Sequence, residues 1–452
     1  MIVSTAGRPF GERTCAGSFS RRLARVVMVI GSLAATAAAA ADPPVKEPPA
    51  ATRLELVTAT VDGGVLEGLS KARCAWRGAD GRRLDVPTDS VVAWGRCPPW
   101  PQEPMVLLVG GGVIAGTIEA IDASTAVVRS AALGRLELPA AAVAGFRRSI
   151  ATGPTAAMPP VAGGPRVRIE LANGDRLEGR RLALREGSVR IETGGPDGDE
   201  QAEGVAAPPR DVTIPMAVVR GIDLTVPAIS DRGHPPAPLP RILVALDDGS
   251  RFPVDSVAIP AGDPLASAVV VLFADGRPVA CDCDREAIVA VAVDGGGGRF
   301  LASLEPVEFS HAPTFGRSWP LARDRTLAGG WLSARGITAF SGLGIHGPAR
   351  VRYRLDAPAR RFESLVAIDD SAGQGGGAIV RVRGRGGAGP WREVFASGVL
   401  RGAEEPVAIR APLAAATEIE LVVEPVPRDG GGLPGGILDR TIWLDPRVVA
   451  DR

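Results

Sequence analysis

Aromatic residues, histidine and lysine are all scarce in this chain of 452 residues. Phe, Trp and Tyr together make up 4% of it, and the only histidines are His234, His311 and His346. The basic residues are almost all arginine, with Lys46 and Lys71 as the only lysines. No nucleophile-elbow, zinc-protease helix or P-loop motif is present, so nothing in the chain favours catalysis. We therefore expect a protein that is not an enzyme.

An excess of charge of one sign is also missing. The chain has 51 basic and 51 acidic residues, and without its first 41 residues the counts are 46 and 50. These charges are dispersed along the sequence. Such a distribution gives neither the basic footprint of a nucleic-acid-binding protein nor a polybasic membrane anchor. We therefore expect no nucleic-acid partner.

Long apolar runs are absent except near the N-terminus. There, Arg21, Arg22 and Arg25 precede an apolar run at 26–33 and a small-residue tract that ends before Asp42. This order is typical of a secretory leader, and the run is shorter than the roughly 20 residues that a membrane span needs. A retained anchor is the alternative. The sequence predicts cleavage, export to the periplasm, cell surface or extracellular space, and no membrane span afterwards.

Cysteine is also infrequent, with five residues in all. Four of them, Cys74, Cys97, Cys281 and Cys283, remain after the leader is removed. Export permits disulfides, and four cysteines allow three pairings. A Cys74–Cys97 bridge is favoured because both lie in one structural unit. The spacing of Cys281 and Cys283 predicts two thiols on one strand face, in a core and without metal.

Glycine and proline, in contrast, are abundant, and they mark a repeat. Residues 84–94, 136–146 and 212–222 share one pattern: two apolar residues two apart, a proline, a valine four residues later and an apolar residue seven later. Upstream of each lies an alternating strand and a Gly-containing turn, which are signals of a hairpin. Residues 241–309 hold a degenerate fourth copy. Each copy predicts a small antiparallel β unit that packs on a neighbour.

After residue 309 the sequence alternates more clearly, at 351–355, 378–382 and 418–423, which is typical of a β-sandwich. The predicted fold is therefore all-β, with tandem curled meanders or small barrels before a sandwich. The segments are a leader at 1–41, a Pro-rich linker at 42–53, units at 54–100, 104–147 and 166–224, a second linker at 225–240, the fourth unit at 241–309 and the sandwich at 315–450.

Several stretches of the last third resemble one family when they are read in order. They are Gly-Leu-Gly-Ile-His at 342–346, Ala-Ile-Asp-Asp at 367–370, Ser-Gly-Val-Leu at 397–400, and Asp439 with Trp-Leu-Asp at 443–445 and Arg447. The segment resembles the NPCBM/NEW2 carbohydrate-binding module, first noticed in glycoside hydrolases of family 98. The resemblance implies a galactose-binding-like jelly roll whose partner is a glycan or polysaccharide. Where the family often has His-Ala-Asp-Trp, this chain has Arg-Thr-Ile-Trp.

Five residues of this segment are candidate sugar ligands. Trp443 and Trp391 offer apolar ring faces for a sugar, and burial in the core is the alternative for each. His346 is a hydroxyl-binding candidate, with a structural hydrogen bond to a turn as the alternative. Asp445 and Arg447, next to Trp443, are polar groups that can orient hydroxyls.

Asp369, Asp370 and Asp439 are candidate Ca²⁺ ligands, because carboxylates and backbone carbonyls in turns hold that ion. Turn capping is the alternative use of such residues. No other cofactor is expected. The leading hypothesis is an exported, non-catalytic glycan-binding or cell-surface scaffolding protein. The alternatives are a structural or protein-interaction protein whose sandwich has lost sugar binding, and a hydrolase with an unrecognised site.

Overall fold

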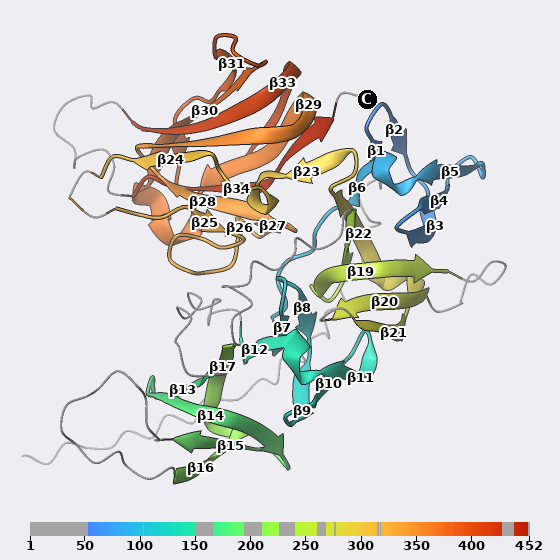
Figure 1. The fold of residues 1–452 in the computed structure, drawn as a ribbon, viewed down its shortest axis with the longest axis vertical. Coiled ribbons are helices and arrows are strands. Elements are labelled where there is room, and N and C mark those ends of the chain that lie inside the picture. The colour runs from blue at the N-terminus through green and yellow to red at the C-terminus, as the bar shows by residue number, and fades with distance from the viewer. Residues whose placement is uncertain are drawn as a thin grey trace, which may run out of the picture. The chain divides into compact units, whose positions relative to one another are not determined.

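The computed structural model describes residues 53–102, 104–149, 166–193, 210–225, 240–259, 268–274, 277–313, 316, 318–426 and 438–450 (Figure 1). The expected leader lies outside these ranges, as do nearly all of both Pro-rich linkers. In the described ranges the only helical segments are six short 3-10 helices, and everything else that is regular is β-strand. The all-β prediction is confirmed. No helix among these residues is long and apolar enough to span a membrane.

The first and second units repeat one small antiparallel fold. An opening strand is followed by a turn, a meander, a 3-10 turn and a last strand that pairs back on the opening strand, as β6 does on β1 and β12 on β7. The elements are β1 (Arg53–Leu56), β2 (Thr60–Asp62), β3 (Val65–Ser70), β4 (Arg73–Arg77), β5 (Arg83–Pro87), η1 (Thr88–Ser90) and β6 (Val91–Gly95), then β7 (Met105–Leu108), β8 (Val113–Ala115), β9 (Thr117–Ile121), β10 (Thr125–Ser130), β11 (Gly134–Pro139), η2 (Ala140–Ala142) and β12 (Val143–Arg147).

The third and fourth units close in the same way, through β13·β17 and β18·β22. Their elements are β13 (Arg166–Leu171), β14 (Arg176–Arg185), β15 (Ser188–Thr193), β16 (Arg210–Pro215), η3 (Met216–Val218) and β17 (Val219–Thr225), then β18 (Arg241–Leu246), β19 (Arg251–Ala258), β20 (Ala268–Ala274), β21 (Arg277–Cys283), η4 (Arg285–Ala287) and β22 (Ile288–Asp294).

The repeated proline has a clear structural role. Pro87, Pro139 and Pro215 each end a strand and precede the 3-10 turn, with φ between −55° and −59°. Proline has no N–H to extend a β ladder, and its fixed φ suits the start of a helical turn. The apolar pair before each proline and the valine after the turn then face one shared core. The repeat motif therefore encodes the turn that closes each unit.

The units associate in pairs through their last strands, but the pairs are nested rather than sequential. In the second and third units, β12 and β17 are antiparallel with Phe146 opposite Ile222. In the first and fourth, β6 and β22 are antiparallel with Trp94 opposite Val291. Each pair has a second contact, β9·β14 and β3·β19 respectively. The buried side chains of all four units form one hydrophobic cluster.

A glycine permits the close contact between the second and third units. A Cβ on Gly145 would lie 2.3 Å from the carbonyl oxygen of Ile222 on the partner strand. Beside it the guanidinium of Arg147, whose side chain is buried, forms an ion pair with Asp223 of the third unit. The second and third units are thus joined by backbone pairing and by a charge pair.

The C-terminal sandwich has a main sheet in the order β25-β28-β34-β29-β33-β30-β31. The long strands β29 and β33 run side by side over most of their length (Figure 1). The elements are β23 (Gly298–Phe300), η5 (Leu301–Ser303), β24 (Glu308–His311), β25 (Ala322–Arg323), β26 (Ser333–Ala334), β27 (Ile337–Thr338), β28 (Gly342–His346), β29 (Ala349–Ile368), η6 (Asp370–Gly375), β30 (Gly377–Arg385), β31 (Arg392–Ala396), β32 (Leu400–Arg401), β33 (Val407–Pro425) and β34 (Arg440–Ala450).

Two sequence expectations need correction. The predicted boundary between the fourth unit and the sandwich, at 309–315, lies too late, because β23 pairs with β34 and β24 pairs with β29. The predicted Cys74–Cys97 bridge is not formed, since all four cysteines of the described residues are free, buried thiols. Cys281 and Cys283 lie in the shared core of the units, as their spacing predicts.

Candidate functional site

Trp443 lies in the core of the sandwich. It is 0% exposed, and its ring meets Phe362 edge-on at 6.3 Å between ring centres. The neighbouring Ile442 and Leu444 point to the opposite face of β34 and are covered there by a second apolar cluster that contains Leu332. A sugar cannot reach the Trp443 ring without opening the sheet, so the ring acts as a core side chain.

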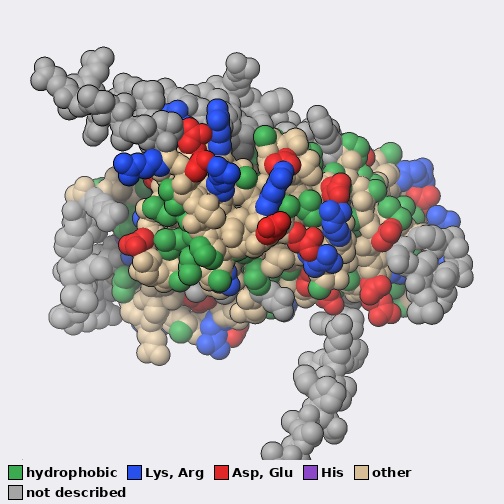
Figure 2. Space-filling view, turned by 90° about the horizontal axis from the view of Figure 1, so that it is seen from below, with side chains coloured by type: hydrophobic (Ala, Val, Ile, Leu, Met, Phe, Trp, Pro, Cys, Tyr) green, Lys and Arg blue, Asp and Glu red, His purple; other side chains and the backbone are tan. Residues whose placement is uncertain are grey.

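Trp391 is half-buried on an outer face of the sandwich. The guanidinium carbon of Arg385 lies 4.5 Å from its ring centre and that of Arg352 lies 5.5 Å away. Arg352 also pairs with the buried Glu420 at 2.7 Å, and Arg385 pairs with Glu418 at 2.6 Å. Arginines therefore already contact the Trp391 ring, and those arginines are neutralised by cross-strand carboxylates. Figure 2 shows the same interspersion of basic and acidic side chains over one face of the molecule.

His346 belongs to an aromatic cluster at one end of the sandwich. Its ring is parallel to that of Trp319, with 5.5 Å between ring centres, and it meets His311 edge-on at 5.4 Å. Its Nδ1 lies 2.7 Å from the carbonyl oxygen of Gly347. Burial, and then the neighbouring His346, hold the pKa of His311 below its ordinary value. His311 is therefore a neutral imidazole at neutral pH.

Trp319 is the residue of this cluster that sequence reasoning missed. It is half-buried, and the guanidinium carbon of Arg440 lies 5.5 Å from its ring centre. Arg440 is opposite His346 in the β28·β34 pairing. A tryptophan in an irregular segment has no periodicity to reveal its direction. The one signal in the sequence for this cluster is the nearby His311, because His311 and Trp319 are both of scarce residue types and lie close together in the chain.

The three predicted Ca²⁺ ligands lie at this same end. The Asp369 carboxylate accepts a hydrogen bond from the Ser371 N–H at 2.9 Å, and that of Asp370 accepts one from the Arg335 N–H at 3.2 Å. Asp439 is buried. Within the described residues, no three His, Cys, Asp or Glu side chains come close enough to hold a metal ion. The observed contacts are those of turn capping, and the calcium expectation stays a prediction.

Several buried polar atoms at this end have no hydrogen-bond partner among the described residues. They include the His311 Nε2, the Asp369 Oδ2 and the Arg440 Nε. The last two residues are also joined through their backbones, since the Asp369 N–H donates to the Arg440 carbonyl at 2.8 Å. Buried polar atoms without partners are uncommon, and such atoms often indicate a bound group or water. Together with Trp319, these polar atoms make this end of the sandwich a candidate ligand site.

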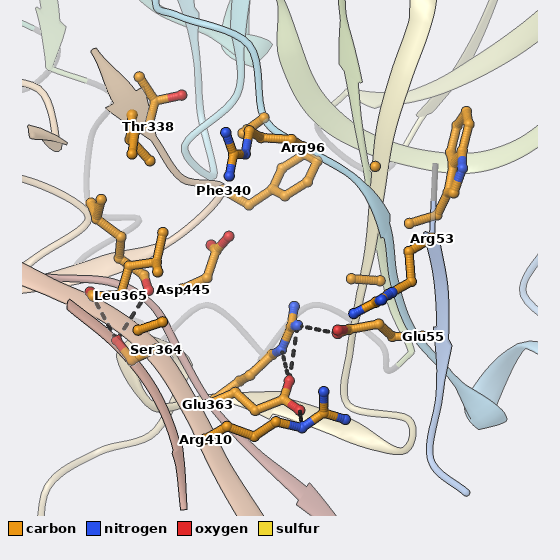
Figure 3. A pocket seen from close by; sticks show the side chains of 18 of the residues that line it. Arg53, Glu55, Arg96, Thr338, Phe340, Glu363, Ser364, Leu365, Arg410 and Asp445 are labelled. Atoms are coloured by element: carbon orange, nitrogen blue, oxygen red, sulfur yellow. Dashed lines mark hydrogen bonds and ion pairs between the residues drawn. The ribbon is translucent and has the colours of Figure 1, made fainter. Parts of the chain in front are cut away.

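Asp445 and Arg447 lie elsewhere, in a pocket of about 370 Å³ between the sandwich and the first unit (Figure 3). An Arg447 Nη2 contacts Glu55 of β1 at 2.7 Å and Glu363 of β29 at 3.0 Å. Asp445 accepts the Ser341 N–H at 3.0 Å and has a positive φ of 46°, a conformation that Asp tolerates better than most residues. The predicted site residues therefore do not form one site. Trp443 lies in the core of the sandwich and Trp391 on its outer face. His346 and the three predicted Ca²⁺ ligands lie at one end, and Asp445 and Arg447 line the pocket.

Burial raises the pKa of Asp445 to about 6, although Arg447 and the backbone N–H groups of Ser341 and Phe340 oppose the rise. The residue as a whole is half-buried and lines the pocket. Asp445 is therefore a carboxylate at neutral pH that becomes protonated in mildly acidic solution.

Residues 300–449 match the family model of the NPCBM/NEW2 domain. This segment is similar to NPCBM/NEW2 domains. The match covers a third of the chain, includes β24 through most of β34, and confirms the resemblance seen in the sequence. The family is one of carbohydrate-binding modules, and the aromatic cluster, the Trp391 face and one wall of the pocket all lie within the matched residues.

Solved structures similar to the chain include carbohydrate-binding modules. The CBM51 of a Clostridium perfringens GH95 protein, in complex with methyl-galactose, is 20% identical and covers 34% of this chain and 99% of its own, with a TM-score of 0.27. Tandem CBM51 modules of a family 98 glycoside hydrolase from Streptococcus pneumoniae are 14% identical, covering 77% of this chain and 88% of their own, with a TM-score of 0.27. At these scores the likeness adds nothing to the family match. No protein of curated function matches the chain.

Proposed function

We propose that this is an exported, non-catalytic protein whose NPCBM/NEW2 domain binds a glycan, while the four β units act as its scaffold. The observation that carries the proposal is the half-buried Trp319 beside His346 and Arg440, in a domain of a carbohydrate-binding family. A partly exposed indole offers an apolar surface to a sugar ring, and the adjacent polar groups can bind its hydroxyls. Export is proposed from the N-terminal leader pattern.

The decisive experiment is a glycan-array screen of the mature chain, followed by titration of the best ligand into wild type and two variants. We expect Trp319→Ala to weaken binding at least tenfold without a large change in melting temperature. Trp391→Ala is the matched control, because its ring is already contacted by arginines on another face. If no glycan binds, or if Trp319→Ala binds as tightly as wild type, this site is wrong.

One observation favours a second candidate, a structural or protein-interaction protein. Trp443, the tryptophan of the C-terminal stretch that resembles the family, is fully buried and therefore not accessible to a ligand. A sandwich with no glycan affinity that still captured a defined protein would support this candidate. Fractionation of cells that produce the chain tests export directly, and a protein that stays in the cytoplasm with its leader intact would contradict it.

A further inference from the structure

The pocket between the first unit and the sandwich is separate from the aromatic cluster around Trp319, and none of that cluster lines it. Its volume of about 370 Å³ falls within the range of small-molecule sites, roughly 300–1,000 Å³. One wall is built from β1, β6, the residues after β6 and Val291 of β22, and the other from β29, β33, β34 and residues 337–340. It exists only where the two parts of the chain meet.

Most charged groups of the pocket are already paired with one another. Glu55 and Glu363 both contact Arg447, and Arg410 lies 3.5 Å from Glu363. Arg53 pairs with Asp62 outside the pocket at 2.9 Å. The Arg447–Glu55 pair joins the two walls, and none of these paired groups is free to receive a ligand charge.

Arg96 is the exception. It lines the pocket, its side chain is exposed, and it makes no hydrogen bond or ion pair with any residue that the structure describes. In Figure 3 its guanidinium and the carboxyl group of Asp445 point toward one another across the opening. A free cation with a forked set of donors is suited to a planar carboxylate, which it can bind through two hydrogen bonds.

The opposite side of the pocket favours a different chemical group of a ligand. Asp445 is a carboxylate at neutral pH and can accept hydrogen bonds from hydroxyl groups, since a carboxylate has several acceptor positions. Phe340 and Leu365, both half-buried, add apolar surface to the lining. A ligand that satisfies this lining carries an anion at one end, hydroxyl donors at the other, and a partly apolar body.

We propose that this pocket binds an acidic sugar unit of the uronic acid class, with the sugar carboxylate on Arg96 and a ring hydroxyl donating to Asp445. The choice of a sugar over another hydroxy acid rests on the proposed glycan-binding function, and the site is additional to the one at Trp319. A neutral sugar leaves Arg96 unpaired. An amine-bearing ligand places a second cation beside Arg96 and Arg447.

The test is calorimetric titration of the full mature chain with glucuronic acid and galacturonic acid, compared with glucose, galactose and the small hydroxy acid glycolate. We expect at least one uronic acid to bind tenfold or more tightly than its neutral counterpart and than glycolate. Arg96→Ala should lose at least tenfold in this affinity. The matched control is Arg82→Ala, an exposed arginine outside the pocket, which should bind as wild type does. Melting temperatures of both variants should equal that of wild type.

Equal affinity for uronic acid and neutral sugar, or undiminished binding by Arg96→Ala, overturns the proposal. Glycolate binding as tightly as the uronic acids overturns the sugar assignment. Trp319→Ala separates the two sites: we expect it to leave uronic acid binding unchanged. If that variant instead abolishes uronic acid binding, the acidic sugar occupies the sandwich end and the pocket proposal fails, while the proposed function stands.

Discussion

The guanidinium carbon of Arg251 lies 3.6 Å from the ring centre of Trp100, and both side chains reach from the β units into the sandwich. An Arg251 Nη1 donates to the Ala339 carbonyl at 2.9 Å and to the Thr338 hydroxyl at 3.1 Å. The Trp100 indole N–H donates to the Leu332 carbonyl at 2.9 Å. This stacked pair is therefore a joint between the β units and the sandwich.

Removing the arginine should loosen that joint. In Arg251→Ala the carbonyls of Pro98 and Ala339 lose a charged donor in a buried site, and we expect a loss of about 3 kcal/mol in unfolding free energy. Urea denaturation followed by tryptophan fluorescence measures it. Arg392→Ala, at an exposed position, is the control and should change stability by less than about 0.5 kcal/mol. Equal stability of the two variants would show that the joint contributes nothing.

Trp443 and Trp391 should respond very differently to truncation. Trp443→Ala leaves a large cavity in the sandwich core, so we expect a loss of about 3–5 kcal/mol. Trp391→Ala removes a half-buried ring and its contacts with two arginines, worth roughly 1 kcal/mol. Thermal and urea unfolding of both variants gives the comparison. A mild effect of Trp443→Ala would mean that the ring is not packed as the structure has it.

Asp445 should make stability depend on pH. Its folded-state pKa of about 6 lies above the ordinary value near 3.9, so the folded protein holds this proton more tightly than the unfolded chain. Its contribution is full below about pH 4 and is lost as the pH rises through 6. Asp445→Asn keeps a side chain that tolerates the positive φ and removes the charge. We expect it to stabilise the protein by about 2–3 kcal/mol at pH 8 and to have no effect near pH 4. A gain that is the same at both pH values contradicts the assignment.

Gly145 tests the contact between the second and third units. A Cβ there would lie 2.3 Å from the Ile222 carbonyl oxygen, so Gly145→Ala must push β12 and β17 apart. We expect a loss of about 1–3 kcal/mol, as for other overpacked sites. Gly398 has open space around its Cβ position, and Gly398→Ala is the matched control. Differential scanning calorimetry of the two variants decides between a tight and a loose contact.

The strands and turns of the units could be predicted from the sequence because each has a local signal. The motif around Pro139 predicts a strand end and a return strand from backbone chemistry alone, and the family pattern at 342–346 predicts the sandwich. Which other unit the last strand of each unit pairs with could not be predicted from the sequence. β12 and β6 carry the same apolar pattern, so nothing local states which unit each will join.

The site was harder to predict for a related reason. Trp443 stands in the apolar run of β34, where both faces of the strand are buried, and an aromatic residue in such a run gives no sign of its direction. Asp445 and Arg447 were named as neighbours of Trp443, yet they line a pocket whose other wall begins some 390 residues earlier in the chain, as the contact between Arg447 and Glu55 shows. Contacts that distant leave no trace in local sequence.

The nested pairing of the units constrains the order in which the chain can fold. The second and third units can join as soon as residue 225 has been made, but β6 and β3 of the first unit wait for β22 and β19 of the fourth. During synthesis the first unit therefore presents unpaired strand edges for the time needed to add about 200 residues. Such edges are templates for aggregation. In a chain cut after the third unit, the strand edges of the first unit stay unpaired permanently. Shortened versions of the scaffold are therefore best trimmed from both ends, so that the second and third units remain as a pair.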